Sequence, residues 1–286
     1  HDHIFMSINY RAKKRPEIIV IVGQTSSGKS AIAITLAKKF NGEIISADSR
    51  QVYRGLDIGT GKITKKEMRG IQHHLLDVAS PTRRFSAALY QKKAWCAVKN
   101  ICRRGNIPII CGGTGFYIDI FLKGLSLPEV KPDKILRHAL EKKSAQELFK
   151  MLRVLDSRRA KTIDQNNPRR LIRAIEIAKA LGHVPPTQYK PKIMLENILT
   201  IGIVLPDKKL KNNIHTRLLK RIESGMIEEA RRLHQNGLSW KRFEELGLEY
   251  RFLARYLEKK ITKQEMLAKL ETAINQYAKR QKQWFK

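Results

Sequence analysis

The first half of the chain alternates short apolar runs with segments whose apolar residues recur at helical spacing. Residues 18–22 (IIVIV) form an apolar, β-branched run, which predicts a strand buried on both faces. Further strands are predicted at residues 43–47 and 107–111, and helices at residues 31–40 and 87–104. This order of strand, helix, strand, helix and strand indicates an α/β fold with a parallel sheet and right-handed crossovers.

The second half of the chain is mainly helical and basic. Between residues 171 and 181 the apolar side chains share one helical face, and residues 198–205 return to the strand pattern before the chain becomes helical again. We therefore expect three parts: a flexible basic tail (1–16), an α/β core with a helical C-terminal part (17–125 and 197–286), and a helical insertion domain (126–196).

Charge and composition narrow the function classes. The chain has 57 Lys and Arg against 26 Asp and Glu, a net charge of +31, which attracts polyanions such as nucleic acid or an anionic membrane face. A Lys-rich proteome is the alternative explanation. The hydrophobic content of 42% excludes a disordered chain. The longest aliphatic run, residues 18–22, is far shorter than the ~20 residues of a membrane span, so we expect no membrane partner. Three cysteines cannot all pair, which favours a reducing, cytoplasmic location.

A phosphate-binding loop follows the first predicted core strand. The motif G-x-x-x-x-G-K-[ST] is matched by Gly23, Gln24, Thr25, Ser26, Ser27, Gly28, Lys29 and Ser30. In such a loop the backbone N–H groups close around phosphate oxygens, and the following helix directs its positive end at the anion. Lys29 adds a charge, and the Ser30 hydroxyl is suited to bind Mg²⁺. The position between a strand and a helix is the context that the motif requires.

The loop by itself does not identify the phosphate compound. An ordinary NTPase needs a second acidic residue for Mg²⁺, often at a later strand end. The predicted strand at residues 107–111 ends instead in Gly-Gly-Thr-Gly. This argues against an ordinary NTPase and leaves a small kinase or another diphosphate enzyme.

Residues 46–62 (SADSRQVYRGLDIGTGK), placed after that loop, make the chain resemble the tRNA dimethylallyltransferases, also called tRNA isopentenyltransferases. These enzymes attach a five-carbon isoprenoid to N6 of adenosine 37, beside the anticodon, in tRNAs that read codons starting with U. The resemblance extends over nearly the whole chain through further blocks in the same order, at residues 73–77, 85–88, 108–117, 167–176, 276–281 and 284–285.

The resemblance implies a P-loop NTPase-like core and assigns roles to the residues that match the family's motifs. The loop would hold the diphosphate of dimethylallyl diphosphate together with Mg²⁺, which accounts for the missing second carboxylate. Asp48 matches the general base that removes a proton from the adenine amine. Position alone leaves open that Asp48 only caps the next helix. Thr114 and Arg217 match the remaining catalytic residues. Near Arg217 the chain departs from the pattern, because Asn213 stands where Arg is common.

The resemblance also implies contacts with the anticodon arm of tRNA and a monomeric enzyme. The matching positions are Asp48, Ser49, Arg50, Gln51, Thr114, Arg137, Arg169, Arg170, Leu171, Ile172 and Arg173. The aromatic residues Phe116 and Tyr117 could line a tunnel for the isoprenoid, but we expect both to pack in the core.

Three other functions remain open at this point. A related enzyme could prenylate free AMP or ADP, although a free nucleotide needs neither the large positive charge nor the basic helix that begins near Arg169. A small-molecule kinase would bind ATP tightly and transfer a phosphoryl group. A non-catalytic RNA-binding module would lose nothing when Asp48 is replaced.

Overall fold

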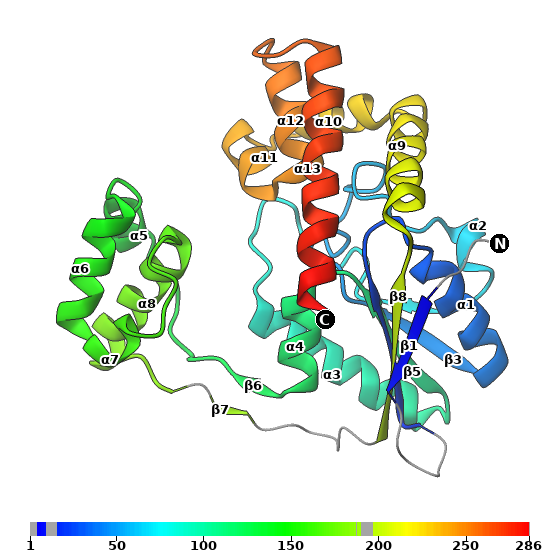
Figure 1. The fold of residues 1–286 in the computed structure, drawn as a ribbon, viewed down its shortest axis with the longest axis horizontal. Coiled ribbons are helices and arrows are strands. Elements are labelled where there is room, and N and C mark those ends of the chain that lie inside the picture. The colour runs from blue at the N-terminus through cyan, green and yellow to red at the C-terminus, as the bar shows by residue number, and fades with distance from the viewer. Residues whose placement is uncertain (1–4, 10–15, 187, 190–196, 286) are drawn as a thin grey trace. The chain divides into compact units, whose positions relative to one another are not determined.

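A computed structural model describes residues 5–9, 16–186, 188–189 and 197–285 (Figure 1). The chain forms two compact units, one of His1–Gly124 with Pro191–Lys286 and one of Leu125–Lys190. The smaller unit thus begins one residue before, and ends six residues before, the helical insertion domain expected at residues 126–196. Each unit is described by itself.

The larger unit is built on a six-stranded sheet with the strand order β1-β8-β2-β5-β3-β4. All neighbouring strands are parallel except β1 and β8. The strands are β1 (Phe5–Asn9), β2 (Ile18–Gly23), β3 (Gly42–Ser46), β4 (His73–His74), β5 (Ile107–Gly112) and β8 (Ile198–Val204). The parallel α/β core predicted from the apolar runs is therefore confirmed. Every residue of β2, β3 and β5 is buried, as continuous apolar strands covered on both faces should be.

The expectation of a loose tail over residues 1–16 is wrong for residues 5–9. These residues form β1, which pairs antiparallel with β8 from Phe5↔Val204 to Asn9↔Thr200. Strand β8 otherwise ends the sheet, and an edge strand offers unpaired N–H and C=O groups that a further strand satisfies. The basic residues at 11 and 13–15 lie outside the described residues.

Helices pack on both faces of the sheet. On one face α1 (Lys29–Phe40) buries Ala33, Ile34 and Ala37 against side chains of β2, β5 and β8. On the other face, as Figure 1 shows, α3 (Ala87–Arg103) and α4 (Gly115–Leu122) pack against each other, and α3 contacts β3 and β5. The covered sheet brings the loops that follow β2, β3 and β5 to one edge, because parallel strands end at the same side.

A second hydrophobic core joins the C-terminal helices to the segment that follows β3. Val52, Tyr53 and Leu56 pack in this core with side chains of the helices that come after β8. The helices are α9 (Asp207–Glu223), α10 (Met226–Gln235), α11 (Trp240–Leu246), α12 (Leu248–Leu257) and α13 (Lys263–Trp284), and a short α2 (Lys65–Met68) lies between β3 and β4. This packing fixes the segment that begins at Asp48.

The smaller unit is helical, as predicted, with its own core around Leu148, Leu171 and Ile175. Its helices are α5 (Lys134–Leu140), α6 (Ala145–Leu155), α7 (Ser157–Ala160) and α8 (Pro168–Leu181). One antiparallel pair of two-residue strands, β6 (Leu125–Ser126) and β7 (Gln188–Tyr189), was not predicted, because so short a ladder leaves no hydrophobic pattern. Within the described residues, no helix has the length and apolarity needed to cross a membrane.

Candidate active site

The phosphate loop connects the end of β2 to the first turn of α1, as the motif predicts. Ser26 and Gly28 take left-handed backbone angles, with φ of 60° and 88°, which turn the chain between strand and helix. At Gly23 a Cβ atom would lie 2.6 Å from the carbonyl oxygen of Ile203, so the strand end has no room for a side chain. The loop amides and the N-terminus of α1 thus converge on one place at the edge of the sheet.

The side chain of Lys29 turns back onto the phosphate loop, and its Nζ donates a hydrogen bond to the carbonyl oxygen of Gln24. Burial lowers the pKa of Lys29 to about 8, an effect that Arg217 adds to and that Cys111 and Asp48 oppose. Lys29, Asp48 and Arg217 therefore lie within electrostatic reach of one another, although Arg217 is far from the other two in the chain.

Side chains from the C-terminal helices support the loop from outside. The Gln281 Oε1 accepts a 2.7 Å hydrogen bond from the backbone N–H of Thr25, and the Gln24 Nε2 donates to the carbonyl oxygen of Ala278 at 3.2 Å. Asn213 donates to the carbonyl oxygen of Ser26 at 3.2 Å. Sequence reasoning missed Gln281 and Asn213 as parts of the site. Their only signals were the block at residues 276–281 and the departure at position 213.

Asp48 follows the end of β3, beside the phosphate loop. Its Oδ1 accepts hydrogen bonds from the backbone N–H groups of Arg50 (2.8 Å) and Gln51 (3.2 Å). Among the residues that the structure describes, none donates a hydrogen bond to Oδ2. Asp48 therefore stabilises a turn rather than the start of a helix, and it presents a second oxygen that could accept a proton.

Thr114 stands at the start of α4, in the turn after β5. Its Oγ1 accepts a 3.0 Å hydrogen bond from the backbone N–H of Ser49, and in the same turn the carbonyl oxygen of Gly113 accepts a 3.5 Å hydrogen bond from the hydroxyl of Tyr277. Burial raises the pKa of Tyr277 to about 12, so its hydroxyl stays protonated at neutral pH. The turn after β5 is thus tied both to the segment that begins at Asp48 and to α13.

The neighbouring aromatic residues behave differently from each other. Tyr117 is buried and stacks on Tyr90 with ring centroids 4.0 Å apart, as expected for a core residue. Phe116 is 41% exposed and does not pack in the core, contrary to expectation. Successive helix residues point in different directions, and only Tyr117 faces α3.

Arg217 projects from α9 toward the same edge of the sheet. Its Nη2 donates a 2.9 Å hydrogen bond to the carbonyl oxygen of Gly61. Burial lowers the pKa of Arg217, and Arg221 adds to this, while Glu249, Asp48 and Glu67 oppose it. The three predicted catalytic residues, Asp48, Thr114 and Arg217, are therefore brought together around the phosphate loop.

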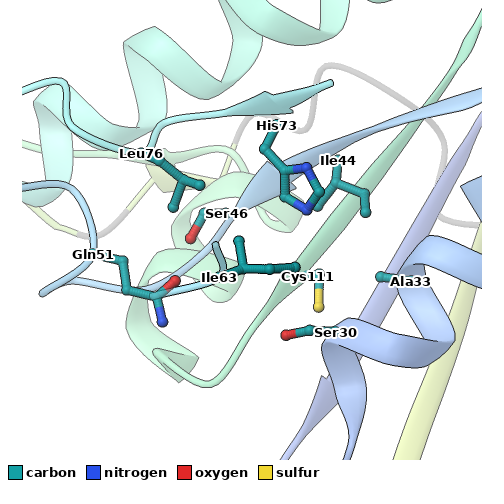
Figure 2. A pocket seen from close by; sticks show the side chains of 9 residues that line it. All are labelled: Ser30, Ala33, Ile44, Ser46, Gln51, Ile63, His73, Leu76 and Cys111. Atoms are coloured by element: carbon teal, nitrogen blue, oxygen red, sulfur yellow. The ribbon is translucent and has the colours of Figure 1, made fainter. Parts of the chain in front are cut away.

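A small pocket opens beside the first turn of α1, and Ser30 and Cys111 face it from α1 and β5 (Figure 2). It is also lined by Ser46, Gln51, His73 and Leu76. Ser30 is exposed, so its hydroxyl is accessible to a ligand of the loop. No group of three or more His, Cys, Asp or Glu able to hold a metal occurs in the described part of the chain.

The predicted tRNA contacts of the smaller unit fall into two groups. Arg169 and Arg170 are exposed in the first turn of α8. Arg137 and Arg173 instead pair with the buried carboxylate of Glu176; Arg137 does so through Nε at 2.9 Å and Nη2 at 2.7 Å. The prediction also included the hydrophobic residues Leu171 and Ile172. Their side chains are buried in the core of the unit, so direct side-chain contact with RNA is incompatible with this structure.

Comparisons with known proteins show which family this chain resembles. The family model described as IPP transferase matches residues 51–286. A tRNA dimethylallyltransferase 2 of Citrifermentans bemidjiense is 44% identical, over 95% of this chain and 87% of that protein. A tRNA dimethylallyltransferase of Roseiflexus sp. is 40% identical, over 94% of this chain and 90% of that protein.

Solved structures show the same likeness in three dimensions. The full-length tRNA isopentenylpyrophosphate transferase of Bacillus halodurans superposes with a TM-score of 0.69 at 36% identity, covering 95% of this chain and 87% of that one. A eukaryotic dimethylallyltransferase acting on tRNA gives a TM-score of 0.76 at 27% identity, covering 94% and 69%. With a phosphate loop, a carboxylate and an arginine at one sheet edge, and relatives that match almost its whole length, the chain belongs to the IPP transferase family.

Proposed function

We propose that this protein transfers the dimethylallyl group of dimethylallyl diphosphate to N6 of adenosine 37 in tRNAs that read codons starting with U, giving N6-isopentenyladenosine. The observation that carries the proposal is the convergence of Asp48, Thr114 and Arg217 on the phosphate loop. Relatives at 40% identity or more are tRNA dimethylallyltransferases.

The diphosphate is the leaving group in this reaction. As the bond between C1 of the isoprenoid and the diphosphate oxygen breaks, negative charge grows on the diphosphate. The loop amides, Lys29 and Arg217 are fixed before the reaction begins, so they stabilise that charge without reorganising. Arg217 and Lys29 approach the loop from different elements, α9 and α1.

Mg²⁺ fits this site, because the exposed Ser30 hydroxyl is a hard oxygen ligand at the loop and Mg²⁺ commonly keeps water and phosphate as its other ligands. When bound, Mg²⁺ would neutralise part of the diphosphate charge. The protein's own part is to hold Ser30 and the loop amides on the same anion.

Asp48 is suited to remove the proton of the adenine amine. An exocyclic amine is a weak nucleophile, because its lone pair is delocalised into the ring. A carboxylate that takes the proton while the bond from N6 to C1 forms removes this difficulty. The backbone N–H groups on Oδ1 keep the carboxylate oriented, and Oδ2 receives the proton.

The exposed arginines at the start of α8, Arg169 and Arg170, would contact the tRNA, because guanidinium groups bind phosphates and stack on bases. Adenosine 37 must leave the anticodon stack to reach Asp48, which takes roughly a few kcal/mol. We place the reaction in the cytoplasm, where the substrate tRNA is available, and expect a monomer.

One assay separates this function from the others. The protein is incubated with Mg²⁺, radiolabelled dimethylallyl diphosphate and either unmodified tRNA bearing adenosines 36, 37 and 38 or free AMP. For the parent protein we expect label on tRNA only. For Asp48→Asn we expect turnover to fall by about 10²–10⁴-fold while the affinity for tRNA stays within about twofold of the parent value. Label on AMP alone would favour the adenylate enzyme, and unchanged turnover in Asp48→Asn would remove the proposed base.

A further inference from the structure

A buried carboxylate on α10 lies next to the segment that carries Gly61. Glu229 is 5% exposed, and its two oxygens accept four hydrogen bonds. Oε2 accepts from the backbone N–H groups of Asp57 (3.0 Å) and Ile58 (2.7 Å), and Oε1 accepts from the N–H of Gly59 (2.9 Å) and the hydroxyl of Tyr250 (2.7 Å). Three consecutive peptide groups therefore direct their N–H bonds at one side chain.

The carbonyl groups of the same segment point to the cations of α9. The Gly61 oxygen accepts from Arg217 at 2.9 Å, and the Gly59 oxygen accepts from Arg221 at 2.7 Å. Gln51, which follows Asp48 by three residues, also donates to the carbonyl oxygens of Thr60 and Gly61, each at 3.4 Å. Residues 57–61 thus connect a buried anion on α10 to Arg217, whose charge interacts with that of Lys29 in the phosphate loop.

We propose that Glu229 is a positioning residue of the transfer reaction, which orients residues 57–61 so that the Gly61 carbonyl holds Arg217 toward the diphosphate. The inference rests on the proposed function, because Arg217 is taken there as a diphosphate ligand. Glu229 does not touch the substrate and acts through the peptide segment and Arg217.

The packing leaves this segment little freedom to adopt another arrangement. A Cβ atom on Gly59 would lie 2.7 Å from the Tyr250 ring, and one on Gly61 would lie 2.4 Å from Nη2 of Arg217. Gly61 also has φ of +58°, in the left-handed region. The peptide planes are therefore set by the carboxylate on one side and by the guanidinium groups on the other.

The chemistry of the carboxylate predicts what Glu229→Gln will do. A glutamine side chain has one acceptor oxygen, so it can serve Asp57 and Ile58 or Gly59, but not all three. Its NH₂ group would then face a backbone N–H, which is a donor opposed to a donor. The peptide at Gly59 loses its partner, and the orientation of the Gly61 carbonyl is no longer fixed.

The test measures the affinity of the full-length protein for inorganic pyrophosphate with Mg²⁺, by calorimetry, beside the kcat and KM for dimethylallyl diphosphate. We expect Glu229→Gln to weaken pyrophosphate binding on the order of tenfold and to leave tRNA affinity unchanged. The matched control is Glu43→Gln. Glu43 is also buried and accepts hydrogen bonds from Arg104, Asn106 and His74, but it lies at the opposite end of β3. This control should lower stability without changing pyrophosphate affinity.

A double-mutant cycle distinguishes positioning from general support of the fold. If Glu229 acts through Arg217, Glu229→Gln should have almost no further effect on pyrophosphate affinity in an Arg217→Ala background. Additive effects, or an affinity equal to that of the parent protein, would overturn the proposal.

Tyr250→Phe is the milder variant if Glu229→Gln does not fold. It removes one hydrogen bond of Glu229 and keeps the ring beside Gly59, so we expect a loss of about threefold in pyrophosphate affinity that disappears in the Arg217→Ala background. A loss that persists there would overturn the proposal. If the parent protein binds pyrophosphate in this Arg217-dependent way but transfers no label to tRNA, the proposed function fails while the positioning role stands.

Discussion

At the scale of single residues, the charged side chains of the site are held by backbone groups. The Lys29 Nζ donates to the Gln24 carbonyl, Arg217 donates to the Gly61 carbonyl, and Asp48 accepts from the N–H groups of Arg50 and Gln51. Backbone partners carry no net charge. The cations therefore keep their charge for the diphosphate and the carboxylate keeps its charge for a proton, which is the preorganisation that electrostatic catalysis requires.

Lys29 makes diphosphate binding dependent on pH. Burial lowers its pKa from 10.5 to about 8 in the free protein, and only the protonated form attracts the anion. Because Lys29 is protonated below its pKa and neutral above it, diphosphate affinity should be constant near pH 7 and decline through pH 8 to 9.5. Calorimetric titration with pyrophosphate across that range measures the decline.

The control for this prediction is Lys29→Met, which has no proton to lose at this position. Its affinity should be weaker at pH 7 and nearly independent of pH. A parent protein whose affinity stays level up to pH 9.5 would show that the charge of Lys29 does not govern binding.

At the scale of elements, one buried face of α13 has two roles. Its earlier residues pack in the C-terminal core, and its last buried residue contacts the site. Its buried residues follow helical spacing, from Met266 through Leu270, Ile274 and Ala278 to Gln281. The first four are apolar and pack in the C-terminal core. The last is polar, and its amide joins the Thr25 N–H of the phosphate loop to the Gly113 carbonyl (2.8 Å) in the turn before Thr114.

Gln281→Ala should therefore loosen two loops at once. Removing the amide leaves the half-buried N–H of Thr25 without this acceptor and the Gly113 carbonyl with only the 3.5 Å hydrogen bond from Tyr277, which lowers the free energy of unfolding by about 1–3 kcal/mol. We also expect the KM for dimethylallyl diphosphate to rise, because the phosphate loop loses a support. Urea unfolding and steady-state kinetics measure the two effects.

Gln283→Ala on the same helix is the matched control, since Gln283 is exposed. It should leave both quantities unchanged. A Gln281→Ala protein with lower stability but the parent KM would mean that α13 supports the fold without influencing the loop.

At the scale of the whole molecule, the basic residues behind the net charge of +31 have more than one role. Arg104 pairs with Glu43, and Arg137 and Arg173 pair with Glu176, so these guanidinium groups serve the fold. Exposed bases such as Arg169 and Arg170 are accessible to a polyanion. The excess of charge alone is thus a poor measure of the surface that meets tRNA.

The salt dependence of tRNA binding distinguishes basic residues that contact tRNA from those that serve the fold. Binding should weaken linearly on a plot of log affinity against log salt concentration, because neutralised phosphates release counterions. Replacing both Arg169 and Arg170 with Gln should reduce the slope by about 1.5, which corresponds to two lost phosphate contacts. Filter binding or fluorescence anisotropy at several salt concentrations measures it.

The double replacement Lys38→Gln with Lys39→Gln removes the same charge from the last turn of α1, at the other end of that helix from the phosphate loop. It should leave the slope nearly unchanged. An equal reduction in both proteins would show that the net charge, rather than the start of α8, determines binding.

Much of the fold and part of the site could be predicted from the sequence, because their signals are local. A β-branched apolar run, a glycine-rich loop and a helical period each depend on neighbouring residues, so they indicated β2, the phosphate loop and α1 directly. The parallel topology then placed Asp48 and Thr114 at one sheet edge. Strand β1 was not predicted, because its partner β8 is almost 200 residues away in the chain, and the short pair β6 and β7 was not predicted either.

Only the tertiary structure decided which polar residues serve the site and which serve the fold. Arg169 and Arg173 belong to one short basic motif, yet one is exposed and the other pairs with a buried carboxylate. Glu229 lies in no block of the resemblance, and the block that contains Gln281 gives that residue no role; the two reach their partners over 170 and 256 residues of chain. The reason is physical: a hydrogen bond or ion pair depends on which groups meet after packing, whereas the sequence by itself determines which segments can pack.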